Sequence, residues 1–256
     1  MMKVDRLGLA ALILGVGGVA CAGLDNPTAL ADLVLDVEFD IEATRVETFD
    51  EVEIHVRVRE GGTHLPMLES RMEIEHHASG AVRTVEMHPE GDGYAAHVMF
   101  YEPGEYHLAF HGMPNRHRLS YKMGEYEIDV YRHHVIVGSY WVEIESSPAP
   151  VLESTEAHIH LTVYNLLPDG TPGLIAAGLD VEVEVHGLDG AETALGAVEE
   201  TPGEYEIQYA FGGAGMYEFH VEIGEDSGEF HFPVIDLDAD EDTAEEGEGD
   251  GHGHGR

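Results

Sequence analysis

The sequence predicts an all-β protein built from two tandem immunoglobulin-like β-sandwiches, and three observations indicate this fold. Short segments alternate apolar with polar residues, as a strand that buries one face does. Turn-forming glycines and prolines separate these segments, and no helix-length periodic stretch interrupts them. A segment at residues 37–60 returns at residues 142–165, so each domain corresponds to one copy of an internal repeat.

The repeat keeps a constant offset over its first part and a larger offset near its end. In the first part, Val37 corresponds to Val142 and His55 to His160, which is the same displacement along the chain. Near the end, residues 104–106 return at residues 215–217, which is a larger displacement. The second copy has therefore gained six residues in its middle, as loop variation on a fixed scaffold produces.

The N-terminus predicts export to a bacterial cell envelope. Residues 1–20 combine basic residues with an apolar run that is too short to cross a bilayer, which is typical of a secretory signal peptide. Cys21 follows directly and is the only cysteine, as in bacterial lipoproteins that carry diacylglycerol on such a residue. We expect a lipidated Cys21, a tether at residues 21–33, and a protein that faces the periplasm or the cell exterior. Ordinary cleavage that leaves a free thiol is the alternative.

The two predicted domains span residues 34–134 and 135–235, and each contains seven short segments, which suits an immunoglobulin-type sandwich. The first domain has predicted strands at 34–41, 51–59, 71–77, 80–87, 94–100, 105–111 and 124–131. The second has them at 140–146, 158–164, 181–186, 193–199, 204–211, 216–223 and 228–235.

The chain is strongly acidic, with 51 Asp and Glu residues against 12 Lys and Arg and a formal net charge of −39. This charge excludes nucleic acid as a partner and excludes electrostatic adhesion to anionic lipid. Attachment to a membrane must then come from the lipid anchor. Residues 236–256 consist mainly of acidic residues and glycine, which cannot bury enough surface to fold, so this tail is predicted to be disordered.

Four outward-facing residues of the first domain form the main candidate metal site. They are His97, Met99, His107 and His111. If strands 94–100 and 105–111 form a hairpin, Met99 lies beside His107 and His97 lies diagonally across from it. Thioether and imidazole ligands favour copper, Cu(I) especially. The alternative is that these are solvated surface side chains.

Other histidines and a methionine are secondary metal candidates. Near the loop end of the first domain they are Met113, His117, His133 and His134. His252 and His254 in the tail could collect a divalent ion weakly. In the second copy, the four main candidates are replaced by Gln208, Ala210, Glu218 and Glu222. A site of that kind is therefore expected in the first domain only.

The sequence also resembles a family of envelope domains. Residues 140–151, 158–165, 169–173, 203–205 and 215–217 resemble a YtkA-like or FixH-like domain, and the first copy resembles it more loosely. Such domains are small immunoglobulin-like modules of bacterial envelope proteins. The FixH relatives are associated with copper delivery for haem–copper oxidase assembly, so the resemblance implies copper as a possible ligand.

Catalysis is not predicted, because the sequence lacks a Gly-x-Ser-x-Gly motif, a phosphate-binding loop, an HExxH motif and a cysteine free to act as a nucleophile. The leading expectation is a non-enzymatic, lipid-anchored envelope protein that binds or delivers copper, with another envelope protein as its partner. The alternative is a structural or protein-interaction lipoprotein without a metal role, which docks through the edges of its sandwiches.

Overall fold

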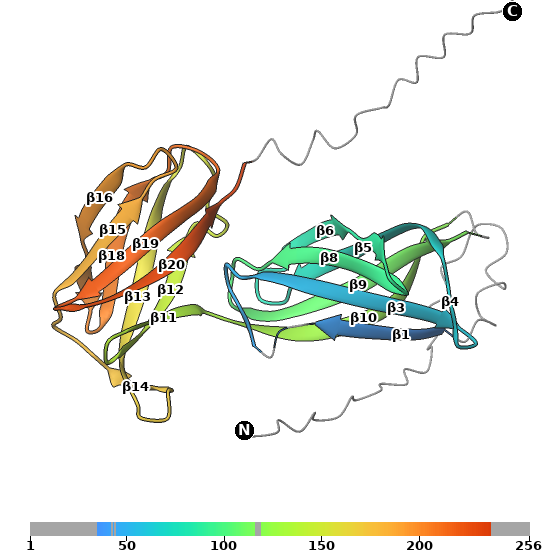
Figure 1. The fold of residues 1–256 in the computed structure, drawn as a ribbon, viewed down its shortest axis with the longest axis horizontal. Coiled ribbons are helices and arrows are strands. Elements are labelled where there is room, and N and C mark those ends of the chain that lie inside the picture. The colour runs from blue at the N-terminus through green and yellow to red at the C-terminus, as the bar shows by residue number, and fades with distance from the viewer. Residues whose placement is uncertain (1–34, 42, 44, 116–118, 237–256) are drawn as a thin grey trace, which may run out of the picture. The chain divides into compact units, whose positions relative to one another are not determined.

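The computed structural model describes residues 35–41, 43, 45–115 and 119–236, and every regular element in them is a β-strand (Figure 1). The predicted all-β fold is confirmed. Within the described residues, no helix is long and apolar enough to span a membrane. The predicted signal peptide, the tether with Cys21, and nearly all of the acidic tail lie outside the described residues.

The first ten strands form two sheets with the strand order of an immunoglobulin-like sandwich. One sheet has the order β1-β3-β8-β7, with β4 beside β3, and the other has the order β2-β10-β9-β5-β6. Their bounds are β1 Leu35–Ile41, β2 Val46–Glu47, β3 Glu51–Glu60, β4 Thr63–His64, β5 Met67–His76, β6 Val82–Glu86, β7 His88–Glu90, β8 Gly93–Met99, β9 Gly104–Pro114 and β10 Tyr121–Tyr131.

The last ten strands repeat this order, with β11 added at the edge of one sheet and no counterpart of β2 at the edge of the other. One sheet has the order β11-β12-β13-β18-β17, with β14 beside β13, and the other has the order β16-β15-β19-β20. Their bounds are β11 His133–Val137, β12 Tyr140–Ser147, β13 Glu156–Leu166, β14 Pro172–Ile175, β15 Val181–His186, β16 Glu192–Gly196, β17 Val198–Thr201, β18 Glu204–Ala210, β19 Gly215–Ile223 and β20 Asp226–Val234. β11 is a strand that sequence patterning did not predict.

Two-residue alternation explains which side chains form each core. In β3, Val52, Ile54, Val56 and Val58 are buried while the residues between them are partly exposed. β13 buries Ala157, Ile159, Leu161 and Val163 in the same way. Since successive side chains of a strand point to opposite faces, each of these strands packs one face into a core and offers the other to solvent.

The described residues fall into two compact units. The first contains residues 52–98 and 105–128 together with the strand before them, and the second contains residues 45–51, 99–104 and everything from residue 129 onward. Residues 45–51 therefore belong to the second unit although they precede it in the chain. Phe49 shows why, because it is part of the same buried cluster as Val137 and Phe232.

The hairpin considered for residues 94–100 and 105–111 does not form. β8 pairs with β7 and β3 in one sheet, whereas β9 pairs with β5 and β10 in the other. In an immunoglobulin-like sandwich, the connection between the corresponding strands crosses from one sheet to the other. Alternation within each strand is compatible with either arrangement, so it could not exclude the crossover.

Candidate metal centre

The candidate centre is built on a short segment that leads into β3, in the second compact unit. Val46 and Glu47 form β2, which runs parallel to the end of β10. Phe49 follows with a left-handed backbone (φ 69°) and is only 6% exposed. That conformation costs about 1–2 kcal/mol in a residue with a β-carbon. The packing of the Phe49 ring against Phe232, at a centroid distance of 4.9 Å, holds it in place.

Backbone hydrogen bonds fix this segment against the start of β11. The amide of Thr48 donates to the carbonyl of Tyr131 at 2.8 Å. The hydroxyl oxygen Oγ1 of Thr48 accepts a hydrogen bond from the amide of His133 at 2.9 Å. Thr48 and His133 are 85 residues apart in the sequence, yet this hydrogen bond joins their two segments. This places Glu47 and Asp50 next to the two histidines that open β11.

Glu47 is a buried carboxylate whose charge is compensated within the unit. It is 6% exposed, and Arg45 lies 2.7 Å from its Oε1. Its Oε2 accepts from the amide of His134 at 3.2 Å and lies 2.8 Å from Nδ1 of the same residue. A buried charge needs such partners, because desolvation otherwise disfavours it. The ring of His134 is itself oriented by stacking on Trp141, with centroids 3.6 Å apart.

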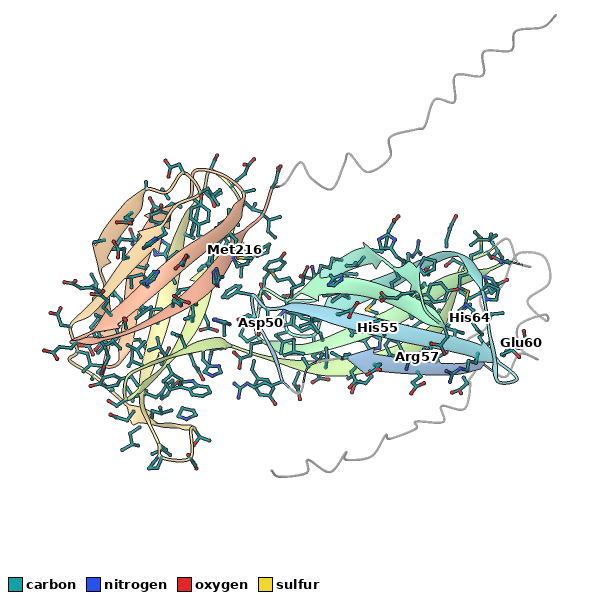
Figure 2. All side chains as sticks on the ribbon, in the orientation of Figure 1. Asp50, His55, Arg57, Glu60, His64 and Met216 are labelled. Atoms are coloured by element: carbon teal, nitrogen blue, oxygen red, sulfur yellow. The ribbon has the colours of Figure 1, made fainter. Side chains whose placement is uncertain are left out.

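His133 lies beside the same carboxylate but is not satisfied by it. Its Nδ1 is buried and makes no hydrogen bond to any described residue. The nearest carboxylate oxygens are Oδ1 of Asp50 at 3.5 Å and Oε2 of Glu47 at 3.9 Å. The rings of Phe49 and Phe230 lie near the imidazole at 6.3 and 6.1 Å and limit its reorientation. Asp50, which directly precedes β3, is the exposed member of the set (Figure 2).

These distances suit ligands of one shared cation better than they suit hydrogen bonds. Ligand atoms of Glu47, Asp50 and His133 all lie within 4.8 Å of one another. Nitrogen and oxygen ligands about 2.0–2.2 Å from a tetrahedral zinc-type ion stand roughly 3–3.5 Å apart. A separation of 3.5–3.9 Å is too long for a hydrogen bond but closes to that range with small side-chain shifts. One imidazole and two carboxylates form a donor set for Zn²⁺ or Cu(II).

The main residues predicted from the sequence do not share a hairpin. His97 and Met99 belong to β8, and His107 and His111 to β9, which lie in different sheets. The Nε2 of His97, whose side chain is 63% exposed, is 3.9 Å from Glu53. His107 is half-buried and its Nε2 lies 3.6 Å from Glu125.

The remaining predicted residues are distributed differently. His111 lies opposite Arg71 in the β5–β9 ladder, and its burial lowers the pKa of its imidazole. Met113 lies opposite Glu69 in the same ladder. His117, His252 and His254 lie outside the described residues. Of the histidines proposed from sequence, His133 and His134 are therefore the ones that the structure brings together with carboxylates in a buried setting.

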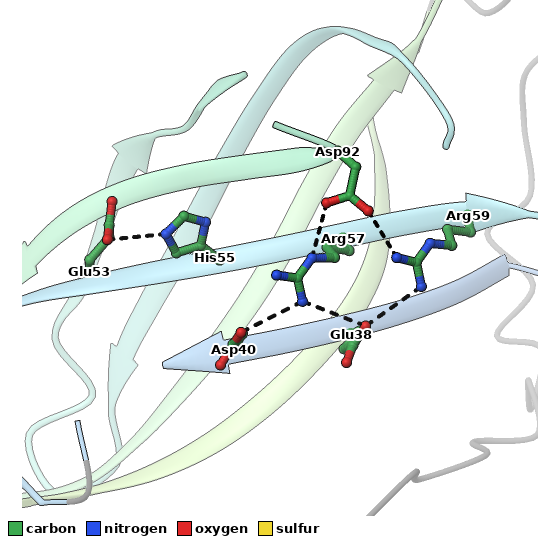
Figure 3. A network of polar contacts seen from close by, with 7 residues as sticks. All are labelled: Glu38, Asp40, Glu53, His55, Arg57, Arg59 and Asp92. Atoms are coloured by element: carbon green, nitrogen blue, oxygen red, sulfur yellow. Dashed lines mark hydrogen bonds and ion pairs between the residues drawn. The ribbon is translucent and has the colours of Figure 1, made fainter. Parts of the chain in front are cut away.

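The outer face of the first unit carries a second polar cluster (Figure 3). Arg57 and Arg59 of β3 lie between three carboxylates, those of Glu38, Asp40 and Asp92. Further along the same strand, Nε2 of His55 is 3.1 Å from Glu53. Glu53 and His55, together with Glu90, have ligand atoms within 4.8 Å of one another. All of these side chains are more exposed than Glu47.

Sequence reasoning missed Glu47 and Asp50. They stand beside a histidine pair only because β2 runs parallel to β10, and such long-range pairing leaves no local periodicity. The sequence contains one usable signal, because the repeat matches Val46 with Val151. In the structure both segments lie beside the last strand of their sandwich, with Val46 opposite Val130 and Leu152 opposite Ile235.

No family model matches the sequence, and no curated protein matches it. Among solved structures, the chain is similar to trypsin-activated α-2-macroglobulin from Escherichia coli (14% identity, TM-score 0.29, covering 77% of this chain and 15% of that one). It is also similar to FdeC, an Escherichia coli adhesin (13%, 0.31, 78% and 64%). A segment of two fibronectin type III domains from chicken tenascin is a third match (11%, 0.26, 77% and 98%). The chain thus spans less than two thirds of the length of the first two. Matches of 11–14% identity at these TM-scores say nothing about activity.

Proposed function

We propose that this protein is a non-enzymatic, lipid-anchored protein of a bacterial envelope that binds a divalent transition-metal ion, copper(II) above all, through Glu47, Asp50 and His133. One observation carries the proposal. A buried imidazole nitrogen without a hydrogen bond to any described residue faces two carboxylate oxygens at 3.5 and 3.9 Å. Buried polar atoms are normally satisfied, and a metal ion would satisfy this one.

The ligand set favours the oxidised form of copper. Imidazole suits Cu(II) and Zn²⁺, carboxylate oxygens are hard ligands, and Cu(I) prefers thiolate and thioether sulfur. Among divalent first-row ions, Cu(II) binds such a site most tightly. The metal state is therefore Cu(II), in place of the Cu(I) that the Met99 and His107 combination favoured.

The cellular address rests on the N-terminal sequence. The signal-peptide pattern of residues 1–20 and the single cysteine at position 21 support export and a lipid anchor at Cys21. The YtkA-like or FixH-like resemblance belongs to the same proposal, since envelope modules of that kind are exported. With this acidity, anionic lipid would repel the protein, so the anchor would be its attachment to the membrane.

A competition titration with Cu(II) tests the site. The exported full chain, with His252→Ala and His254→Ala to remove the tail ligands, is titrated against a chelator of known affinity. We expect Asp50→Asn and His133→Phe each to weaken binding at least about tenfold, since even outer-shell partners are worth that much. His133→Phe keeps an aromatic ring between Phe49 and Phe230, so a folding defect is not expected.

His97→Ala is the matched control, because it removes an exposed imidazole from β8. It should leave the affinity unchanged. Equal Cu(II) affinity in the parent protein and in the Asp50→Asn, His133→Phe and His97→Ala variants would overturn the site. A loss of Cu(II) affinity confined to His97→Ala would instead indicate that the metal binds on the outer face of β8.

A second candidate function is a protein-interaction module, and a specific observation favours it. Around β14, Leu167, Leu174 and Ile175 are 43, 83 and 48% exposed. Exposed apolar side chains that cluster often mark contact surfaces. If this candidate holds, a photo-crosslinker at position 174 captures one defined envelope protein in intact cells, and Leu167→Glu abolishes the adduct. No defined adduct would count against it.

A further inference from the structure

The outer face of the β16-β15-β19-β20 sheet alternates histidine with glutamate across its strands. In the β15–β19 ladder, His186 lies opposite Glu218 and Glu184 opposite His220. In the β19–β20 ladder, His220 lies opposite Glu229. The intervening residues, such as Val185 and Phe219, are buried in the core. Side chains that face each other on one side of a sheet stand about 4.5–5.5 Å apart at Cβ, within reach of a shared ligand.

The two imidazoles of this face lie against each other, and that of His186 has a buried nitrogen without a hydrogen-bond partner among the described residues. The rings of His186 and His220 are stacked with centroids 4.6 Å apart. Nε2 of His220 lies 2.6 Å from Oε1 of Glu218. Nε2 of His186 makes no hydrogen bond to any described residue, and its nearest carboxylate oxygen is that of Glu184 at 3.8 Å. Glu218, His220 and Glu229 have ligand atoms within 4.8 Å of one another.

No lysine or arginine competes for these carboxylates from the surrounding strands, although His231 of β20 lies opposite Glu218. The sequences of β15, β19 and β20 contain neither lysine nor arginine. Indeed, none occurs anywhere between Arg132 and Arg256. A divalent cation would neutralise the carboxylates and bind both rings in their neutral form.

We propose that His186, His220, Glu218 and Glu229 form a second metal site, which takes a zinc-type divalent ion. Glu218, His220 and Glu229 already have ligand atoms within 4.8 Å of one another, and His186, whose ring stacks on that of His220, would supply the fourth ligand that Zn²⁺ takes in tetrahedral sites. The strands β15 and β19 lie in the middle of their sheet, which makes the backbone rigid. The site goes beyond the proposed function, because it shares no residue with the Glu47 centre and stands or falls without it.

The test uses Zn²⁺ as the probe and the exported full chain as the protein. Its background variant carries Asp50→Asn, His133→Phe, His252→Ala and His254→Ala, so that the Glu47 centre and the tail contribute nothing. We expect one equivalent of Zn²⁺ to bind in competition with a chromophoric chelator. His220→Gln and His186→Gln should each weaken this binding at least about tenfold.

His158→Gln is the matched control, since it removes an imidazole from the other sheet of the same unit, where Nδ1 of His158 lies 2.7 Å from Glu206. It should leave the affinity unchanged. The melting temperature of each variant without zinc shows that the fold is intact. An equal loss in all three variants, or no stoichiometric binding at all, would show only loosely held counter-ions and overturn the site. Neither result bears on the proposed metal site at Glu47, because that site is removed in the background variant.

Discussion

The two halves of the molecule share one scaffold and differ in how they neutralise its charge. In the first ladder Val37 pairs with Val58, and in the second Val142 pairs with Val163, so both partners are displaced equally along the chain. The special backbone positions repeat as well. Left-handed Phe49 matches left-handed Ser154, and Gly104 matches Gly215, both of which have positive φ.

The change of offset can now be placed. Ile74 pairs with Leu108 and Val185 pairs with Phe219, so the β5 and β15 strands already have the larger of the two offsets. The six extra residues therefore lie between β3 and β5 in the repeat. In the second copy this stretch contains β14 and the exposed side chains of Leu167 and Leu174. The insertion adds surface without disturbing either core.

The outer faces differ in their cations. The first unit neutralises Glu38 and Asp92 with Arg57 and Arg59 (Figure 3). The residues that correspond to these arginines in the second copy are Thr162 and Tyr164. The glutamates Glu143 and Glu145 there pair with Arg132. The same fold can therefore carry a face whose carboxylates lie beside arginines or one whose glutamates lie beside histidines.

The largest difference concerns residue 49 and its counterpart. Phe49→Ala should destabilise the second unit by about 3 kcal/mol, because it removes a buried ring from the core. Trp141 is the only tryptophan and lies in this unit, so denaturant unfolding followed by its fluorescence reports the loss. Phe49→Leu, which keeps most of the apolar volume, should cost clearly less. An unchanged Trp141 transition in Phe49→Ala would contradict this part of the comparison.

A shared tyrosine tests whether the two cores are held alike. The hydroxyl oxygens of Tyr94 and Tyr205, which correspond to each other in the repeat, accept hydrogen bonds from the amides of Met67 and Leu179 at 2.7 and 2.8 Å. Replacing either tyrosine with phenylalanine should cost about 1 kcal/mol, since an amide loses its partner. Hydrogen exchange at the amides of Met67 and Leu179 measures each loss separately. If one amide remained protected, the two tyrosines would not be equivalent.

Ser154 has the left-handed backbone of Phe49 without its packing, because its side chain is exposed. Ser154→Gly should therefore stabilise the second unit by up to about 1 kcal/mol, since glycine adopts this conformation without steric cost. The melting temperature followed at Trp141 measures the gain. Phe49→Gly is the contrasting variant and should destabilise the unit despite the same relief. A lower melting temperature for Ser154→Gly would show that the serine makes a contact of its own.

The smallest effects concern the exposed ion pairs. Hydrogen bonding from Arg59 lowers the pKa of Asp92, and hydrogen bonding from His158 lowers the pKa of Glu206. A lowered carboxyl pKa contributes stability above the unfolded-state pKa, and this contribution is lost as the pH falls through the folded-state pKa. Arg59→Ala should raise the pKa of Asp92 toward its ordinary value, and His158→Gln that of Glu206. Carboxyl-carbon NMR titrations measure both, with Asp169 as an unaffected reference, and high salt should shrink each shift.

The candidate site shows where sequence reasoning reaches its limit. His133 and His134 could be selected from the sequence because they are adjacent and stand at the end of a domain. Glu47 and Asp50 could not, since they lie in an earlier part of the chain, with Glu47 87 residues before His134. Likewise, Met99 and His107 could be expected to face outward, but the alternating pattern cannot tell whether neighbouring strands share a sheet.

The sequence alone determined the all-β class, the repeat and the buried face of nearly every long strand, because alternation and turn residues act locally. It also determined the acidity and the scarcity of basic residues in the second half. The tertiary structure decided which strands pair, where the six extra residues lie, and which histidines meet which carboxylates. These features depend on contacts between distant segments, such as the parallel pairing of β2 with β10 and the packing of Phe49 in the core of the second unit. Local sequence patterns do not encode such contacts.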